Sequence, residues 1–208
     1  MAIELAFENV SKRFKRDWIL ENLSFHIKQG SKTAILGKNG SGKSTLLKII
    51  SGFTSTTAGE VQWTKDAAQL DVTKWHLNYT FSAPYLELIE EFTLQESIDF
   101  HFSLKGIRKD IVLDDILKEA GLSDHLSKQV CNFSSGMKQR LKLVLSLCSD
   151  VPIYLLDEPC SNLDHSGIEW YKTMIQSLPS CKTIIVASNN KDEYSFCEDT
   201  INVFRHAN

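Results

Sequence analysis

Residues 37–44 read Gly-Lys-Asn-Gly-Ser-Gly-Lys-Ser and match G-x-x-x-x-G-K-[ST], the pattern of a phosphate-binding loop. Glycines in such a loop let consecutive backbone N–H groups turn towards a phosphate. Lys43 would then reach the β- and γ-phosphates of a nucleotide, and the hydroxyl of Ser44 would be a ligand for Mg²⁺. A glycine-rich turn without a ligand is the alternative interpretation.

The elements on both sides of this loop favour phosphate binding. Residues 33–36, Thr-Ala-Ile-Leu, form the short apolar run of a buried strand, and residues 46–50 have the apolar spacing of a helix. The N-terminus of that helix would add partial positive charge where the phosphates sit. A strand, a loop and a helix in this order therefore predict a nucleotide site.

Two adjacent carboxylates follow a second apolar run, Ile-Tyr-Leu-Leu at residues 153–156. Asp157 at the strand tip is placed to hold Mg²⁺, directly or through water, and Glu158 can accept a proton from an attacking water. A solvated strand end would show the same two residues. The phosphate loop earlier in the chain favours the interpretation as a metal ligand and a general base.

The order of the apolar patterns predicts an α/β fold. Alternation over residues 5–10 and 23–27 predicts antiparallel strands, with another short strand at 60–63. From residue 94 to 120 the spacing becomes helical, and strands return at 153–156, 183–187 and 201–204. We therefore expect a mostly parallel core sheet flanked by helices, an N-terminal antiparallel β-subdomain and a helical insertion.

Composition excludes several classes of protein. A chain of 208 residues suits one domain, and its formal net charge of -3 gives no electrostatic argument for nucleic acid as a partner. No apolar stretch approaches the roughly 20 residues needed to cross a bilayer, and the first residues show no signal-peptide pattern. The 5 cysteines include no C-x-x-C pair, so we expect neither a disulfide framework nor a zinc site, and a reducing cytosol fits best.

A third motif, Phe-Ser-Ser-Gly-Met-Lys-Gln-Arg at residues 133–140, opens a helix with one apolar face. Alone, Ser-Ser-Gly is a helix cap. Together with the phosphate loop, Asp-Glu-Pro at 157–159 and Ser-Asn-Leu-Asp at 161–164, it resembles the signature motif of ATP-binding cassette (ABC) ATPases. The resemblance covers essentially the whole chain. It implies one P-loop NTPase domain, with a nucleotide-binding core at 1–80 and 134–208 and a helical subdomain at 81–133.

The resemblance implies a subunit that binds and hydrolyses ATP with Mg²⁺ and powers a separately encoded integral membrane permease. Such a subunit is cytoplasmic and peripheral on the cytoplasmic face of the membrane. In this family two cassettes close head to tail, so an ATP-dependent homodimer or pseudo-dimer is expected. The acidic and apolar segment 85–92 is where the permease would dock, although an ordinary junction between a loop and a helix is the alternative.

The family's remaining positions are assigned by the same resemblance. The aromatic residue that stacks on adenine matches Phe14, with Trp18 as a nearby rival. The expected nucleotide-binding residues are Phe14, Gly37, Lys38, Asn39, Gly40, Ser41, Gly42, Lys43, Ser44, Thr45, Ser134, Ser135, Gly136 and Asp164. The signature residues and Asp164 would act on the nucleotide of the partner subunit. The expected metal ligands are Ser44 and Asp157, and the expected catalytic residues are Glu158, Lys43 and Asn189.

Two positions depart from the family pattern. Family members carry a Gln at the junction between the core and the helical insertion, where this chain has Ser82 and no Gln nearby. The switch His after the next core strand is replaced by Asn189. An Asn amide donates one neutral hydrogen bond and carries no positive charge, so it stabilises the transition state less. We therefore expect slow hydrolysis, and the alternative is a nucleotide-gated binding or regulatory module with very slow turnover.

Overall fold

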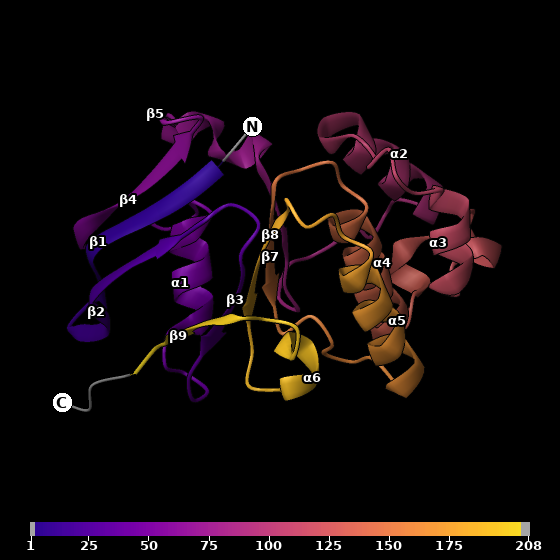
Figure 1. The fold of residues 1–208 in the computed structure, drawn as a ribbon. Helices are drawn as coiled ribbons and strands as arrows, with labels where there is room; N and C mark the ends of the chain where they lie inside the picture. The colour runs from indigo at the N-terminus through magenta and orange to yellow at the C-terminus, as the bar shows by residue number, and fades with distance from the viewer. Residues whose placement is uncertain (1–2, 205–208) are drawn as a thin grey trace.

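Two sheets organise the chain, and the structure, a computed structural model, describes residues 3–204 (Figure 1). The antiparallel sheet has the order β2-β1-β4-β5, with strands β1 (Ile3–Phe14), β2 (Asp17–Ile27), β4 (Ala58–Lys65) and β5 (Ala68–Gln69). The parallel sheet has the order β6-β7-β8-β3-β9, with strands β3 (Lys32–Leu36), β6 (Tyr79–Ser82), β7 (Ile153–Asp157), β8 (Thr183–Ala187) and β9 (Asp199–Asn202). The predicted α/β fold class is confirmed.

Helices cover both faces of the parallel sheet. They are α1 (Lys43–Ile50), α2 (Leu94–Lys105), α3 (Leu113–Glu119), α4 (Ser135–Leu147), α5 (His165–Gln176) and α6 (Lys191–Tyr194), with short 3₁₀ turns at Val72–Leu77, Ser123–His125 and Val130–Asn132. In Figure 1, α1 lies on the side of the antiparallel sheet, whereas α4, α5, α2 and α3 lie on the other side.

Strand β7 packs against a different apolar cluster on each face of the parallel sheet. Ile153 and Leu155 belong to the apolar cluster that includes α1 and the antiparallel sheet. Tyr154 and Leu156 belong to the cluster that includes α2, α4 and α5. Because successive side chains of a strand point to opposite faces, a strand buried on both faces reads as a continuous apolar run. This arrangement holds the carboxyl end of β7, where Asp157 lies, rigidly between the two cores.

The segment predicted to be helical forms α2 and α3. Helix α2 begins with a capping box, in which Thr93 and Glu96 exchange hydrogen bonds between side chain and backbone, and it ends at Gly106 with φ of 69°. Its buried residues Leu94 and Ile98 pack into the cluster that also contains α4. The insertion therefore packs against the helix that carries the signature motif.

Three strands, β5, β6 and β9, differ from the expectation, and β5, with two residues, is too short to show alternation. Strand β6 was not predicted, because four residues followed by Ala83 and Pro84 are too short to show alternation. It extends the parallel sheet to Ser82, two residues beyond the boundary expected for the nucleotide-binding core. Strand β9 covers Asp199–Asn202 instead of 201–204, and it pairs with β3 through Asp199 to Thr33 and Asn202 to Leu36.

Candidate nucleotide-binding site

The phosphate loop connects the end of β3 to the N-terminus of α1. Gly42 has φ of 109°, and a Cβ atom there would lie 2.8 Å from Cδ2 of Leu20. A Cβ atom on Gly37 would lie 2.3 Å from the carbonyl oxygen of Val203. Only glycine fits both positions. The N–H groups of the loop and of the first turn of α1 thus gather at the carboxyl edge of the parallel sheet.

Two side chains inside the loop fit a phosphate ligand. Lys43 is buried, and its Nζ donates hydrogen bonds to the carbonyl oxygens of Gly37 at 2.9 Å and Lys38 at 3.4 Å. The Oγ atom of Ser41 is buried and has no hydrogen-bond partner within residues 3–204. A buried hydroxyl without a partner is costly, and the oxygens of a bound phosphate would satisfy it.

Asp157 lies at the tip of β7 and is 2 % exposed. Burial raises the pKa of its carboxyl group, and hydrogen bonds from the hydroxyls of Ser44 and Tyr85 oppose that increase. The structure therefore brings together Ser44 and Asp157, the two expected metal ligands. Hydroxyl and carboxylate oxygens are the ligands that Mg²⁺ prefers, so this pair fits the expected metal.

Glu158 follows directly, in an unusual backbone conformation. Its φ is 43°, and its N–H group donates to the carbonyl oxygen of Ala187 at 2.9 Å. A glutamate in the left-handed region costs about 1 kcal/mol or more, and such strain persists where the surrounding structure imposes it. The exposed side chain lines a pocket of 250 Å³ together with Phe14, Ile19, Asn39, Gly40, Gly42, Lys43, Ser44 and Thr45.

The structure separates the two candidates for adenine stacking. Phe14 lines the pocket and is 48 % exposed, and Nζ of Lys12 lies 4.9 Å from its ring centroid. Trp18 does not line the pocket, and its ring lies 5.2 Å from the guanidinium carbon of Arg13. Phe14 is therefore the aromatic residue beside the phosphate loop. Ile19, which also lines the pocket, was missed because an isolated aliphatic residue in a strand resembles any core position.

The signature residues line no part of this pocket. Ser134 is the N-cap of α4, where its Oγ accepts a hydrogen bond from the N–H of Met137 at 3.2 Å. Ser135 is exposed beside it, and a Cβ atom on Gly136 would lie 3.2 Å from the carbonyl oxygen of Asn162. The start of α4 and the loop after β7 therefore form one neighbouring surface, separate from the phosphate loop.

Asp164 connects this loop to the signature helix. Its Oδ1 accepts hydrogen bonds from the N–H of Gly167 at 2.9 Å, as the N-cap of α5, and from Nη2 of Arg140 at 2.8 Å. The backbone N–H of Gly167, the hydroxyl of Ser166 and Arg140 lower the pKa of the Asp164 carboxyl. The role of Arg140 was not predicted, because 24 residues separate it from Asp164.

The two positions that depart from the family pattern have different environments. Ser82 is 2 % exposed, its Oγ is buried without a hydrogen-bond partner in the described chain, and it is not among the residues that line the nucleotide pocket. The hydroxyl of Tyr85 instead donates to Oδ2 of Asp157 at 2.9 Å, a contact that no local sequence pattern indicates. Asn189 lies at the phosphate loop, where its Nδ2 donates to Oδ1 of Asn39 at 2.7 Å.

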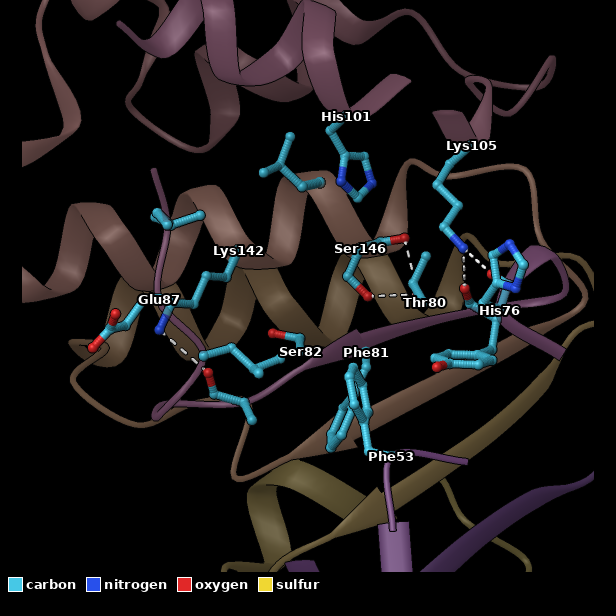
Figure 2. Close-up of a pocket in the computed structure, with 15 residues that line it drawn as sticks. Phe53, His76, Thr80, Phe81, Ser82, Glu87, His101, Lys105, Lys142 and Ser146 are labelled. Carbon is cyan, nitrogen blue, oxygen red and sulfur yellow. Dashed lines mark hydrogen bonds between the residues drawn. The ribbon is translucent and has the colours of Figure 1, made fainter. Parts of the chain in front are cut away.

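A separate groove of 310 Å³ lies between β6, α2 and α4 (Figure 2). Its lining residues are Phe53, His76, Tyr79, Thr80, Phe81, Ser82, Ala83, Leu86, Glu87, Leu88, His101, Lys105, Lys142, Leu145 and Ser146. Lys142 donates to the carbonyl oxygen of Pro84 at 2.8 Å, and Lys105 donates to that of Tyr79 at 2.9 Å. Three residues of the segment expected to dock the permease, Leu86, Glu87 and Leu88, therefore form one wall.

This fold and site define a P-loop ATPase with a helical insertion and a signature helix. The family model described as ABC transporter matches residues 20–161, and the chain belongs to that family. The lantibiotic transport ATP-binding protein SrtF of Streptococcus pyogenes is 30% identical over 205 residues, covering 95% of this chain and 85% of the relative. The spermidine/putrescine import ATP-binding protein PotA of Mycoplasma mycoides is 28% identical, covering 95% of this chain and 57% of the relative.

Solved structures agree with this assignment. The dimeric structure of MJ0796, a bacterial ABC transporter cassette, has a TM-score of 0.81 and 27% identity, covering 96% of this chain and 94% of that one. A post-hydrolysis state of the same cassette, bound to ADP and Pi, has a TM-score of 0.79 and 26% identity, with coverage of 97% and 94%. The chain is therefore an ABC ATPase cassette, with ATP as its nucleotide.

Proposed function

We propose that this chain is the subunit of an ABC transporter that binds and hydrolyses ATP with Mg²⁺ and powers a separately encoded permease. The observation that carries the proposal is the convergence of Lys43, Ser44, Asp157 and Glu158 at the carboxyl edge of the parallel sheet. These are a phosphate-binding lysine, two oxygen ligands and a carboxylate positioned as a base.

The roles follow from the positions. The loop N–H groups and Lys43 bind the β- and γ-phosphates, and Phe14 offers a ring face to adenine. Ser44 and Asp157 would hold Mg²⁺, which neutralises charge on the phosphate oxygens. Glu158 orients the attacking water and accepts its proton. Asn189, anchored to the phosphate loop, donates a neutral hydrogen bond to the γ-phosphate.

Two copies of the chain would complete each site. The exposed N-terminus of α4, with Ser134, Ser135 and Gly136, offers a hydroxyl and N–H groups to an anion, but it lies outside the pocket of its own chain. The dimeric cassette among the similar structures supports the pairing of two cassettes. We expect the pair to be head to tail, so that this surface meets the γ-phosphate of the partner. Asp164 and Arg140 would hold that surface in shape.

The groove of Figure 2 is the proposed docking site for the permease on the cytoplasmic face of the membrane. Phe53, 66 % exposed, and Leu88 give it apolar surface, and Glu87 adds a charge at the rim. Within residues 3–204 no helix has the length and apolar character of a membrane span. A separate membrane subunit is consistent with the transport proteins to which the chain is similar.

Two residues favour a second function, a nucleotide-gated module with very slow turnover. Asn189 replaces the switch histidine and has no ionisable group, and Ser82 lines the groove of Figure 2 rather than the nucleotide pocket. Both changes weaken the stabilisation of charge in the transition state.

A steady-state ATPase assay with purified protein distinguishes these functions. The variant Glu158→Gln, which lacks the proposed general base, serves as the reference. Turnover of the wild type at least about 100-fold above that of Glu158→Gln supports an ATPase that drives transport. Equal rates would support the nucleotide-gated module.

Photo-crosslinking in membranes tests the partner. A photoreactive amino acid replaces Phe53 in the groove or, as a matched control of similar exposure, Val112 before α3. We expect an integral membrane protein to crosslink at position 53 and not at 112. Equal labelling at both positions would contradict docking in the groove.

A further inference from the structure

Tyr85 contacts the nucleotide-binding site and adjoins the groove of Figure 2, which have different roles in the proposed function. Its hydroxyl donates a hydrogen bond of 2.9 Å to Oδ2 of Asp157 at the tip of β7. The next three residues, Leu86, Glu87 and Leu88, line the groove of Figure 2. One residue therefore contacts the expected metal ligand and adjoins the groove wall.

The ring of Tyr85 is fixed by contacts on its face and edge. Nζ of Lys48, on α1, lies 4.3 Å from the ring centroid, which is the geometry of a cation–π contact. Phe81, on β6, meets the ring edge-on with a centroid distance of 6.5 Å. These contacts hold the phenol so that its hydroxyl points to Asp157 while Tyr85 as a residue remains 44 % exposed.

The sheet register brings the two residues together. Strands β6 and β7 are parallel neighbours, and Ser82 pairs with Leu156, so the chain that leaves β6 passes beside Asp157. The side chain of Ser82 itself is buried and has no hydrogen-bond partner in the described part of the chain. In the segment that follows β6, the residue that makes a polar contact with Asp157 is therefore Tyr85, three residues after Ser82.

We infer that Tyr85 is a positioning residue for the metal site, which holds the Asp157 carboxylate in the orientation that binds Mg²⁺ and transmits metal binding to residues 86–88. The inference rests on the proposed role of Asp157 as a metal ligand. The Tyr85 hydroxyl contacts Oδ2, and the Ser44 hydroxyl, the other expected metal ligand, also hydrogen-bonds the carboxylate, so Tyr85 and Ser44 together set its orientation. Hydrogen bonds of this kind orient ligands, and their loss typically lowers metal affinity about 10-fold or more.

The effect of Tyr85 on metal binding can be tested with Mn²⁺ as the probe. Its binding to the full chain, in the presence of the slowly hydrolysed analogue ATPγS, is measured by electron paramagnetic resonance. We expect Tyr85→Phe to weaken Mn²⁺ binding about 10-fold, while the affinity for ATPγS without metal is unchanged. Tyr154→Phe is the matched control, because it removes a phenol hydroxyl from β7 itself that donates to the carbonyl oxygen of Ser149 at 2.8 Å. Its Mn²⁺ affinity should equal that of the wild type.

The variant Asp157→Asn shows whether a negative result overturns only the role of Tyr85 or also the proposed role of Asp157 as a metal ligand. If Asp157→Asn weakens Mn²⁺ binding but Tyr85→Phe does not, the role of Tyr85 is overturned while the metal site stands. If Asp157→Asn also leaves Mn²⁺ binding unchanged, the assignment of the metal ligand is overturned, and the inference with it.

Hydrogen exchange tests the transmission to the groove. Adding Mg²⁺ to the ATPγS complex should slow amide exchange at residues 86–88 in the wild type, and this protection should be smaller in Tyr85→Phe at equal metal saturation. Equal protection in both proteins, or none in the wild type, would overturn the link to the groove.

Discussion

The side-chain amide of Asn189 donates a hydrogen bond of 2.7 Å to the side-chain oxygen of Asn39, which joins the end of β8 to the phosphate loop. Strands β3 and β8 are parallel neighbours, with Ile35 paired to Ala187, so the segments that follow them emerge side by side. A residue two positions beyond β8 therefore lies beside the phosphate loop regardless of its type. We therefore expect the chemistry of that residue, rather than its position, to limit the reaction.

Replacing Asn189 with His should raise kcat by about tenfold and leave ATP affinity nearly unchanged. The imidazole can stabilise negative charge that develops on the γ-phosphate, and an interaction strengthened only in the transition state raises kcat rather than binding. Asn189→Ala should slow turnover further. Steady-state kinetics check both changes, and equal rates for all three proteins would place residue 189 outside the reaction.

Lys43→Ala should weaken ATP binding by about 10- to 100-fold, because it deletes a charge-assisted contact to phosphate worth about 1.5–3 kcal/mol. The fold should persist, since Lys43 makes its hydrogen bonds only to the loop itself among the described contacts. Isothermal titration calorimetry measures the affinity, with Lys65→Ala on β4 as the control. Unchanged binding would contradict the assignment of the phosphate loop.

Glu158→Gln should retain ATP binding and lower turnover by about two orders of magnitude, because the amide cannot accept the proton of the attacking water. The slowed variant should also accumulate as a dimer in the presence of ATP. Single-turnover assays and light scattering measure the two effects, with Glu169→Gln on α5 as the control. Rapid hydrolysis by the variant would remove Glu158 from its role.

The α/β fold class and the loop between β3 and α1 could be predicted from the sequence because the strand, loop and helix signals there are local. The contacts of Tyr85 with Asp157 and of Arg140 with Asp164 could not, since they depend on strand register and helix packing. The segment after Pro84 was predicted as a docking surface, and the position of Leu86 to Leu88 in the groove wall supports that hypothesis. No local sequence pattern indicates that the hydroxyl of Tyr85 points towards Asp157.

His101, on α2 at the groove, provides a pH-dependent contribution to stability. Its Nε2 donates to Oγ of Ser149 at 2.9 Å, because that hydroxyl in turn donates to the carbonyl oxygen of Leu145. Burial, together with the charge of Lys105, lowers the pKa of the imidazole to about 4. The unfolded chain, with an ordinary pKa of about 6.5, therefore takes up a proton at higher pH than the folded chain does.

The folded state should consequently lose stability as pH falls from about 6.5 towards 4, since the unfolded state binds more protons over this range. After allowing for solvent screening of a partly exposed ring, the contribution of His101 between pH 7 and pH 5 is about 1 kcal/mol. His101→Gln removes the titrating group and retains a donor for Ser149. Urea unfolding at both pH values should show a loss about 1 kcal/mol smaller in the variant, and carboxyl groups that titrate in both proteins cancel in the comparison. An identical loss in the two proteins would mean that His101 is protonated as readily in the folded chain as in the unfolded one.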